Sequence, residues 1–505
     1  MERANKYRKP GVLASLWLRL EKVLNLVATS AYNPFYYLGA ISIFFLWIIF
    51  VTGIYLFVFY SISAAGAYNS VQRLTVNQWY LGGVIRSLHR YASDGLIIAA
   101  LTHGVRHYIL DRYKHWRWVS WVTGLMMVLI IIVGGIFGYA LVWDQRAQFI
   151  AVSLSKMIES IPIFGMPMSI SFARIENLAD QVFYLLLAVH FVAIIVVTVL
   201  VMIHLGRVAK SVINPPKTLA YGLIAVLLLL SFTRPALSTG PADLRMLPQA
   251  IPFDWFYMFM FPFMKYMTEH ELWLFMIAII LIVGIIPWLT AEKKSPVVQV
   301  AKENCTGCEL CREDCPYGAI HMRKRTDGMP YELEAYVVDK RCASCGICMG
   351  ACDYKALNLP DLTEAALKNE IERFSAELAG TQGKKVIVFN CAKGAWPDGT
   401  LEANGKVKGF EWARVVTLQC IGMLQPSMLS IPFENKIDGV FIAGCRLGDC
   451  SFRRGNEWLI GRINGYRTPV VKKSLDRSRI STAWLSAVES GAMLDELGRF
   501  QKNLK

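Results

Sequence analysis

The sequence predicts three consecutive units: an all-α transmembrane helix bundle of about six spans, a small α+β domain, and a small α/β domain. Long apolar stretches with few charges fill residues 36–292, whereas all twelve cysteines lie between Cys305 and Cys450. A chain of 505 residues has room for about three domains at roughly 150 residues each. We therefore expect domains at residues 1–295, 296–362 and 363–505.

Six stretches in the first unit are long enough to cross a bilayer, whose core needs about 20 apolar helical residues. They lie near residues 36–60, 81–109, 119–143, 182–206, 218–236 and 272–292. The basic N-terminal segment contains no apolar run followed by a small-residue cleavage site, so we expect no removable signal peptide. The first span is therefore expected to stay in the mature protein.

Lysine and arginine are concentrated in alternate loops of the bundle, and such residues accumulate on the cytoplasmic side. The basic set comprises Arg3, Lys6, Arg8, Lys9, Arg19, Lys22, Arg112, Lys114, Arg117, Arg207, Lys210 and Lys217, followed by Lys293 and Lys294 after the sixth span. The loops near residues 61–80, 144–181 and 237–271 carry a lower density of positive charge. This asymmetry predicts a multi-pass protein of the cytoplasmic (inner) membrane of a prokaryote, with the cysteine-rich units in the cytoplasm. The formal net charge of +15 then follows from topology and anionic lipid and requires no nucleic acid.

Inside the predicted spans, four of the eight histidines form two pairs with the same spacing. His89 and His103 are fourteen residues apart in the second span, and His190 and His204 are fourteen apart in the fourth. Fourteen helical residues return to nearly the same face after about 21 Å, so the two helices place His89 opposite His190 and His103 opposite His204. Ionisable residues at membrane depth are costly and usually functional. The alternatives are simple hydrogen bonds and zinc, but tetrahedral zinc needs more ligands per level, whereas haem takes two axial ligands.

Four glycines in the first and third spans repeat this spacing. Gly39 and Gly53 are fourteen residues apart, and so are Gly124 and Gly138. A residue without a side chain lets a flat ring lie against the helix backbone. We therefore expect these glycines to line the slots that hold two haems.

Residues 33–290 resemble cytochrome b of the cytochrome bc complexes in four stretches. These are RSLHRYASDG around His89, LTHGVR around His103, GYALVWDQ from Gly138 and ESIPIFG from Glu159. The resemblance implies two b haems stacked across the membrane, and it is compatible with a homodimer, as in that family.

The resemblance also implies a role for each ligand. It assigns the pair His89 and His190 to an outer, lower-potential haem and the other histidine pair to an inner haem. Arg86 and Arg106 match arginines that meet haem propionates in the family, and charge pairing favours such contacts.

The loop after the fifth span reads Pro252-Phe253-Asp254-Trp255-Phe256-Tyr257. It resembles the PEWY element of the family's outer quinone site, with an insertion and with aspartate in place of glutamate. A carboxylate beside a quinol hydroxyl can accept its proton as electrons leave, so Asp254 and Tyr257 are the expected catalytic residues. The alternative is an interfacial aromatic turn, because tryptophan and tyrosine favour that depth. Lys210 stands six residues after His204, where the mitochondrial-type inner quinone site has histidine, so the face that binds quinone stays open.

Eight cysteines form two motifs of the type CxxCxxCxxxC, and clustered cysteines in the cytoplasm favour metal over disulfides. The motifs are Cys305, Cys308, Cys311 and Cys315, then Cys342, Cys345, Cys348 and Cys352. This is the spacing of two-cluster bacterial ferredoxins, in which each fourth cysteine crosses to the other 4Fe-4S cluster. We therefore expect Cys352 to complete the first site and Cys315 to complete the second. Zinc, which favours isolated cysteine pairs, is the alternative.

The segment KRTDGMPYELEAYVVD, between the two motifs, predicts a β-hairpin around Asp327-Gly328. It is either a docking surface or an insertion without a function of its own.

The last four cysteines follow strand-like runs in the third unit. VIVFN precedes Cys391, VVTLQ precedes Cys420, GVFIAG precedes Cys445, and Cys450 follows shortly after. Helices are expected at residues 361–380 and in an amphipathic stretch at 482–498. Parallel strands of an α/β sheet present ligands at their carboxyl ends, so the four thiolates can meet. Four thiolates suit one 2Fe-2S cluster, with zinc and unligated cysteines as the alternatives.

The stretch IDGVFIAGCRLGDCSFRRGN resembles the delta subunit of methyl-viologen-reducing hydrogenase, and the likeness covers residues 384–470. That subunit is a 2Fe-2S carrier that links heterodisulfide reductase to its electron-exchanging partners. The resemblance implies a 2Fe-2S cluster on Cys391, Cys420, Cys445 and Cys450, and a soluble partner similar to the flavin-containing subunit of heterodisulfide reductase. The sequence shows neither GxGxxG after a strand nor a Walker loop, so we expect the flavin to belong to that partner.

Together these features predict the quinone-reacting subunit of an oxidoreductase, which carries electrons between a soluble cytoplasmic partner and a menaquinone-type quinone. The expected order of carriers is the delta-like cluster, the two 4Fe-4S clusters, the inner haem and the outer haem. The alternative function is a non-catalytic conduit and membrane anchor that passes electrons to another membrane or outer-face protein.

Overall fold

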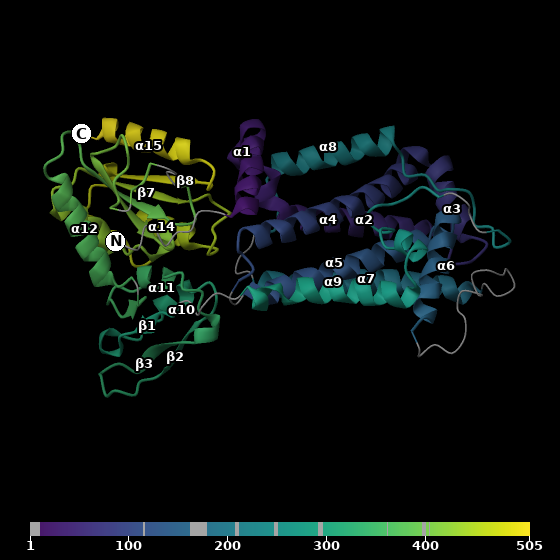
Figure 1. Ribbon diagram of the computed structural model, residues 1–505, viewed down its shortest axis with the longest axis horizontal. Helices are drawn as coiled ribbons and strands as arrows, with labels where there is room; N and C mark the ends of the chain where they lie inside the picture. Colours follow the sequence, from purple (N-terminus) through teal and green to yellow (C-terminus); the bar gives the residue numbers. More distant parts are fainter. Residues whose placement is uncertain are drawn as a thin grey trace.

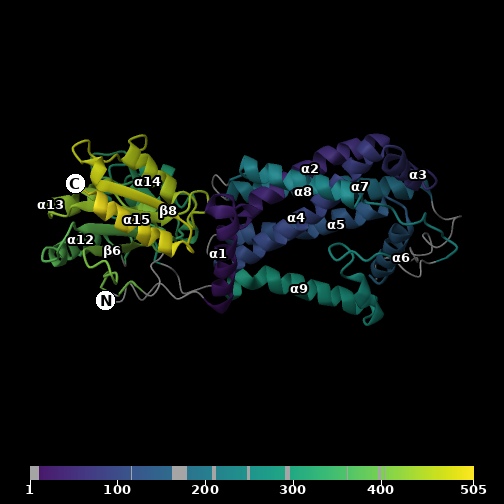
Figure 2. The ribbon, with the colours of Figure 1, turned by 90° about the horizontal axis from the view of Figure 1, so that it is seen from above.

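The computed structural model describes residues 11–114, 117–161, 179–207, 212–246, 251–290, 296–360, 362–395, 400–402 and 404–504. The molecule is elongated, with a helical half at one end and an α/β half at the other (Figure 1). The helical half holds α1 (Val12–Tyr32), α2 (Leu38–Phe59), α3 (Ala67–Gln72), α4 (Val84–Ile109), α5 (Trp118–Ala140), α6 (Gln145–Glu159), α7 (Asp180–Arg207), α8 (Lys217–Thr233) and α9 (Glu269–Leu289). Within it α2 packs against α4, α5 packs against α7, and α8 lies along α4 (Figures 1 and 2).

Four helices of the described chain are long and apolar enough to cross a membrane. They are Pro34–Phe59, Trp118–Ala140, Asp180–Gly206 and Glu269–Leu289. The second and fifth predicted spans are also helices, but α4 carries three arginines and one aspartate, and α8 has only 17 residues. The chain is therefore a multi-pass membrane protein, while the expected number of six spans stays a prediction.

The end of the bundle that faces the α/β half gathers basic loops. Helix α1 lies across this end of the bundle, transverse to the other helices (Figure 2). The α4–α5 loop lies at the same end, where Arg112 and Arg117 bond to the α/β half. The basic loops and the cysteine-bearing domains thus share one side, as charge asymmetry predicted. Residues 3–9, Lys210, Lys293 and Lys294 of the predicted basic set lie outside the described residues.

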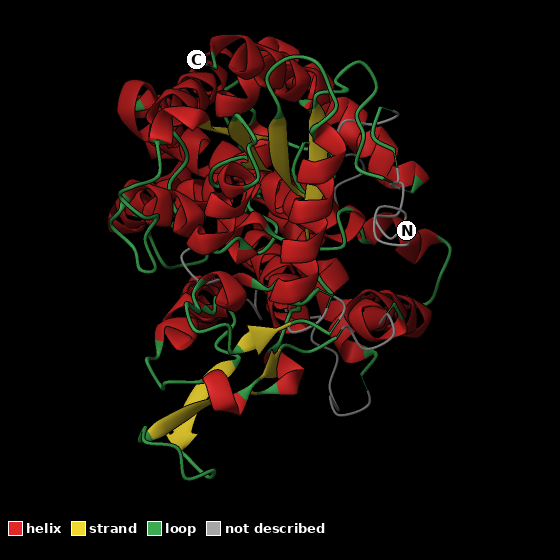
Figure 3. Cartoon of the chain, turned by 90° about the vertical axis from the view of Figure 1, so that its left-hand side faces the viewer, coloured by secondary structure: helices red, strands yellow, loops and turns green. Residues whose placement is uncertain are grey.

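The small α+β domain is built from two short antiparallel sheets. Its elements are β1 (Gln299–Val300), α10 (Leu310–Asp314), β2 (Ile320–Lys324), β3 (Leu333–Val337), α11 (Ile347–Gly350) and β4 (Leu357–Asn358). Strand β1 pairs with β4, and β2 pairs with β3. The β2–β3 pair confirms the predicted hairpin, which projects from the body of the molecule (Figure 3).

The C-terminal domain is a parallel sheet with helices on both faces. Its elements are α12 (Glu364–Leu378), β5 (Val386–Cys391), β6 (Ala413–Leu418), α13 (Ser430–Glu434), β7 (Gly439–Cys445), α14 (Gly455–Asn464), β8 (Ile480–Leu485) and α15 (Ser490–Asn503). The strand order is β6-β5-β7-β8, and all neighbours are parallel. Alternate residues of the strands pack against α12 and α14 on one face and against α15 on the other.

Three of the four strands and α12 confirm the sequence-based predictions. The amphipathic helix expected at residues 482–498 is wrong in its first half, because β8 forms there and only α15 is helical. The run ISTAWL is rich in β-branched and aromatic residues, which suit a strand, and it pairs with β7 along its whole length. The predicted amphipathic pattern extends over a stretch that includes both the end of β8 and the start of α15, so it does not reveal the boundary between the strand and the helix.

Candidate haem and iron-sulphur sites

The predicted histidine pairs lie on α4 and α7, on opposite sides of the bundle's interior. The rings of His89 and His190 have centroids 6.4 Å apart, with 52° between their planes. Two metal–nitrogen bonds of about 2 Å each, with two ring half-widths of roughly 1 Å, would separate such centroids by about 6 Å. This pair is therefore spaced to hold one metal ion between two imidazoles.

Each predicted glycine faces one of the four histidines from the neighbouring helix. A Cβ atom added to the glycine would lie close to Cε1 of that ring, at 3.1 Å for Gly39 and His103, 3.2 Å for Gly53 and His89, 3.1 Å for Gly138 and His190, and 3.8 Å for Gly124 and His204. The glycines of α2 thus leave room for the histidine rings of α4, and the glycines of α5 leave room for those of α7. The sequence interpretation expected these glycines to face a flat macrocycle, but the structure shows that they also make room for the imidazole rings.

Three of the histidines have their Nδ1 atom fixed by the adjacent helix. His89 Nδ1 lies 3.0 Å from Thr52 Oγ1, His204 Nδ1 lies 2.9 Å from Thr123 Oγ1, and His190 Nδ1 lies 2.8 Å from the Gly134 carbonyl oxygen. Both threonine hydroxyls donate to a carbonyl one turn earlier, so they accept from the ring, as does the Gly134 carbonyl. The proton therefore sits on Nδ1, and Nε2 keeps the free electron pair that a metal requires.

The two predicted propionate arginines have different surroundings. Arg86 donates to Thr75 Oγ1 at 2.6 Å and to Ser238 Oγ at 2.9 Å. Arg106 is buried, and it donates to Glu21 Oε1 at 2.8 Å and to both carboxylate oxygens of Asp449 at 3.0 and 2.9 Å. These three bonds use three of the five guanidinium hydrogens, so two remain for another acceptor such as a propionate.

Asp449 ties the α/β half to the bundle. Besides Arg106, it accepts hydrogen bonds from Arg112, at 2.5 Å to Oδ1 and 3.2 Å to Oδ2. Burial raises the pKa of this carboxyl, but the guanidinium groups of Arg106 and Arg112 outweigh burial and hold the pKa well below its usual range. Asp449 therefore stays ionised, and it directly precedes Cys450.

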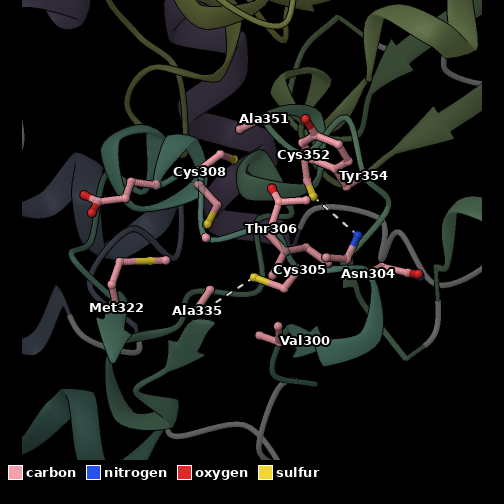
Figure 4. A pocket seen from close by; sticks show the side chains of 15 residues that line it. Val300, Asn304, Cys305, Thr306, Cys308, Met322, Ala335, Ala351, Cys352 and Tyr354 are labelled. Carbon is pink, nitrogen blue, oxygen red and sulfur yellow. Dashed lines mark hydrogen bonds between the residues drawn. The ribbon is translucent and has the colours of Figure 1, made fainter. Parts of the chain in front are cut away.

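The first cysteine site has its four predicted members around one cavity. Cys305, Cys308, Cys311 and Cys352 line a space of about 340 Å³ that is partly open to solvent (Figure 4). The backbone N–H groups of Ala335 and Ala356 donate to the sulfurs of Cys305 and Cys352, at 3.5 and 3.3 Å. Such bonds stabilise negative charge on sulfur. Cys352 thus lines the same cavity as the first three cysteines of the first motif.

The second cysteine site mirrors the first. Cys315, Cys342, Cys345 and Cys348 line a cavity of about 320 Å³. Burial raises the pKa of Cys345 to about 12, and the neighbouring sulfurs of Cys315, Cys342 and Cys450 add to the shift. A thiol in this position stays protonated unless a metal takes the place of the proton.

The last four cysteines come together at the carboxyl edge of the parallel sheet. Cys391 and Cys445 end β5 and β7, Cys420 follows β6, and the sulfurs of Cys391 and Cys445 are 3.5 Å apart. Cys420 and Cys450 interact with this pair. The thiol of Cys420 is fully buried, and a Cβ on Gly455 would lie 2.2 Å from its sulfur, so only glycine fits there. In the described part of the chain, no group of three or more His, Cys, Asp or Glu side chains has the geometry of a single-ion site.

The loop with Asp254 and Tyr257 contacts α4 and α5. Asp254 Oδ1 accepts the backbone N–H groups of Phe256 and Tyr257, both at 2.8 Å. Its Oδ2 accepts the Tyr139 hydroxyl at 2.7 Å and pairs with Arg90. The Tyr257 hydroxyl bonds to Ser93. Both carboxylate oxygens therefore have protein partners in this conformation.

Comparison with known proteins divides the chain into three regions. The profile of the cytochrome b/b6/petB family matches residues 23–212. Within this region, cytochrome b6 of Synechococcus elongatus is 31% identical over 185 residues, which are 36% of this chain and 86% of that relative. The chain belongs to the cytochrome b/b6 family. Cytochrome b6 of Prochlorothrix hollandica is 33% identical over 142 residues, which are 28% of this chain and 63% of that relative.

The regions after the cytochrome b domain match two iron-sulphur families. The 4Fe-4S dicluster domain matches residues 304–357, and the methyl-viologen-reducing hydrogenase delta subunit matches residues 386–505. A solved structure described as a hyperthermophilic respiratory Complex III aligns with a TM-score of 0.43 and 16% identity, over 54% of this chain and 80% of that chain. The predicted fusion of the three families is confirmed.

Cytochrome b implies haem b, and a dicluster domain implies 4Fe-4S clusters, and the residues present fit both. The histidines fit because Nδ1 of His89, His190 and His204 is bonded to the adjacent helix, which leaves Nε2 with the electron pair that a metal requires. The cysteines fit because each set of four lines its own cavity, with sulfurs that accept backbone N–H groups.

Several residues of the cytochrome b sites escaped the sequence interpretation. Thr52 and Thr123 directly precede Gly53 and Gly124, so a Thr-Gly pair repeats on the first and third spans. That repeat was a readable signal for the threonines that orient the histidines. No comparable signal marked Asp449, because its partner Arg106 lies 343 residues earlier in the chain.

Proposed function

We propose that this chain is the electron-transfer subunit of a membrane oxidoreductase, which exchanges electrons between a soluble cytoplasmic partner and membrane quinone. The cofactors would be two haems b, two 4Fe-4S clusters and one 2Fe-2S cluster, and the quinone would be of the menaquinone type. When bound, these groups supply one-electron redox chemistry. The protein residues hold them in line and exclude water.

Each candidate site has a defined role in the proposal. His89 and His190 hold the outer haem, and His103 and His204 hold the inner one. Arg86 and Arg106 serve the haem propionates at the two levels. The two ferredoxin sites and the delta-like site hold the clusters in the sets of four described above. Asp254 and Tyr257 form the outer quinone site.

One observation carries the proposal. The iron-sulphur half is anchored to the bundle through Arg106, an arginine that is expected to serve the inner haem. A redox domain that only needed a membrane anchor would have no reason to dock on that residue. The soluble partner is then the electron-exchanging subunit, similar to the flavin-containing subunit of heterodisulfide reductase. The cytoplasmic location follows from the basic loops that gather at the same end.

The decisive experiment uses the complex purified from its native membrane. Duroquinol, a soluble quinol analogue, should reduce the haems, as followed by their visible absorbance. Inertness of both haems toward duroquinol, in a preparation whose haems respond to dithionite, would contradict the quinone part of the proposal.

A second candidate function is favoured by the state of Asp254. Both of its carboxylate oxygens are engaged by protein donors, so accepting a quinol proton would require one bond to open. The chain could then act as a conduit and anchor, which passes electrons to another membrane or outer-face protein. In that case duroquinol fails, and a protein acceptor copurifies with the complex.

A further inference from the structure

We infer that the delta-like site, formed by Cys391, Cys420, Cys445 and Cys450, is the immediate electron-exchange neighbour of the inner haem. Neither ferredoxin site, that is, neither the first nor the second cysteine site described above, holds that position. The first ferredoxin site is then the port for the soluble partner. The order becomes first ferredoxin site, second ferredoxin site, delta-like site, inner haem and outer haem. This inference rests on the proposed function, and it replaces the order expected from the sequence, in which the delta-like cluster came first.

The second ferredoxin site and the delta-like site pack directly together. Cys345, Ile347 and Cys420 share one buried cluster with Tyr317 and Phe452. Three glycines allow the segments of the two sites to approach each other so closely, because a side chain at any of these positions would collide with a neighbouring segment. A Cβ on Gly350 would lie 2.2 Å from the Gly422 carbonyl oxygen, and one on Gly422 would lie 2.5 Å from the Gly455 Cα. Gly350 and Gly422 follow Cys348 and Cys420 by two residues, and a Cβ on Gly455 would lie 2.2 Å from the Cys420 sulfur.

The loop that carries Cys445 and Cys450 makes the contact with the membrane bundle. Arg446 donates to the carbonyls of Ser30 and Ala31 at 2.7 and 3.3 Å and to the Tyr37 hydroxyl at 2.5 Å. Asp449 holds Arg106 and Arg112, as described above. Arg117 donates to the Ser451 carbonyl at 2.7 Å.

One further contact lies at this end of the bundle. A Cβ on Gly448 would lie 3.6 Å from the side chain of Val212, which follows α7. The path from the delta-like site toward the inner haem would run from Cys450 to its neighbour Asp449, and through the hydrogen bonds of Asp449 to the Arg106 side chain, three residues after His103. The ferredoxin domain adds one bond at this junction, from Arg117 to the Tyr317 hydroxyl.

The first ferredoxin site can be reached from solvent. Of the twelve cysteines, all of which lie in the described part of the chain, only Cys308 is exposed. Its cavity is open to solvent, and Tyr354 at the rim is 53% exposed (Figure 4). A soluble protein can therefore reach a cysteine of this site without displacing any element. The other two sites have no exposed cysteine, although Cys315, Cys342 and Cys450 are partly buried.

Each transfer in this order moves one electron and breaks no bond. The donor is a reduced one-electron carrier protein at the first site. With the cofactors bound, the electron would leave one iron centre, which would be oxidised by one unit, and enter the next, which would be reduced by one unit. No proton or atom has to cross the junction.

The test follows haem absorbance and cluster EPR in the intact complex, with a reduced two-cluster ferredoxin, freed of excess dithionite, as the probe donor. We expect Cys450→Ala to abolish the 2Fe-2S signal and to slow haem reduction at least 100-fold, while both 4Fe-4S signals still appear at the rate of the unmodified complex. Haem reduction within twofold of the unmodified rate, with the 2Fe-2S signal gone, would overturn the order.

Asp449→Asn tests the junction without removing a ligand. In the unmodified complex the oxidised inner haem, which is paramagnetic, should accelerate the spin relaxation of the reduced 2Fe-2S cluster more than that of the first 4Fe-4S cluster. The variant should keep all cofactors and lose most of this difference, with haem reduction slowed about tenfold. An equal relaxation effect at the two clusters of the unmodified complex would contradict the proposed neighbours.

Glu377→Gln is the matched control, because it removes a carboxylate–arginine pair of the same domain, with Arg414, away from the junction. We expect it to behave as the unmodified complex. Neither measurement involves quinone. A complex that reduces its haems from the ferredoxin side but ignores duroquinol would therefore refute the quinone proposal and leave the order intact.

Discussion

Replacing Gly138 with alanine should disturb the outer haem site far more than the same change at Gly124 disturbs the inner one. An added Cβ at Gly138 lies 3.1 Å from Cε1 of His190, about 0.3 Å inside the 3.4 Å at which ordinary contact begins. At Gly124 the corresponding distance to His204 is 3.8 Å, which is ordinary contact. The imidazole must therefore move in the first variant only.

The free-energy cost of moving the His190 ring can be estimated. Overpacking a fitted interior costs about 1 to 3 kcal/mol, and each 1.4 kcal/mol corresponds to about tenfold in an equilibrium constant. We expect about 5- to 150-fold weaker haem retention at the outer site of the Gly138→Ala variant. His190 cannot retreat freely, because its Nδ1 is bonded to the Gly134 carbonyl.

Haem content per chain and a potentiometric titration of the two haems provide the assay. The Gly138→Ala protein should lose part of the lower-potential component, and the Gly124→Ala protein should keep both components at full amplitude. Equal losses in the two variants, or no loss in either, would refute the inference that these glycines make room for the histidine rings.

Three other predictions concern single interactions. Thr52→Val removes the hydroxyl that accepts the hydrogen bond from His89 Nδ1. The reduction potential of the outer haem should therefore shift by roughly 40 mV, which corresponds to about 1 kcal/mol. In the control Thr102→Val, which removes a hydroxyl bonded to a carbonyl of its own helix, the potentials of both haems should stay unchanged. The junction should be insensitive to pH between 5 and 8. The pKa of Asp449 is depressed from an unfolded value of about 3.9. Its contribution to the stability of the junction is therefore complete above about pH 5 and is lost only as the pH falls below that value. Release of the iron-sulphur half near pH 6, as detected by limited proteolysis, would contradict this prediction. Gly455→Ala should abolish the 2Fe-2S EPR signal and leave the 4Fe-4S signals unchanged, because the added Cβ would collide with the Cys420 sulfur. Gly491→Ala, where the added Cβ has open space around it, should change none of these signals.

The sequence predicted what repeats, and it did so for physical reasons. The fourteen-residue spacings of histidine and glycine follow from helix geometry, and the cysteine spacings follow from the shape of a cluster site, so both are visible in one dimension. The structure brings Cys352 to the first motif and Cys315 to the second, and it sets each glycine against the expected helix.

The arrangement of the domains was beyond the sequence. The docking of the delta-like loop depends on a pairing between Arg106 and Asp449, two charged residues whose partners no local pattern specifies. The expected order of carriers followed the resemblance of each domain to its family, and a family describes a domain alone and not its neighbours in a fusion. The strand β8 was missed for a different reason, because the stretch expected to be one helix spans both the end of β8 and the start of α15.

The role of Asp254 can be decided by comparing it with Asp94, since both carboxylates pair with Arg90. Asp254→Asn keeps an oxygen for the backbone N–H groups of Phe256 and Tyr257, so the loop should hold its shape. If Asp254 accepts the quinol proton, duroquinol should reduce the haems about 10²- to 10⁴-fold more slowly in this variant, the range for a lost general base.

Asp94→Asn supplies the control that separates proton acceptance from the positioning of Arg90. It removes the other carboxylate partner of that arginine and leaves Asp254 in place. A loss confined to Asp254→Asn assigns the base to Asp254, and equal losses assign the effect to Arg90. Haem reduction by dithionite should be normal in both variants, which shows that the bundle is intact. If Asp254→Asn keeps the duroquinol rate within about threefold, the carboxylate only shapes the loop, and the conduit function becomes the better account of the chain.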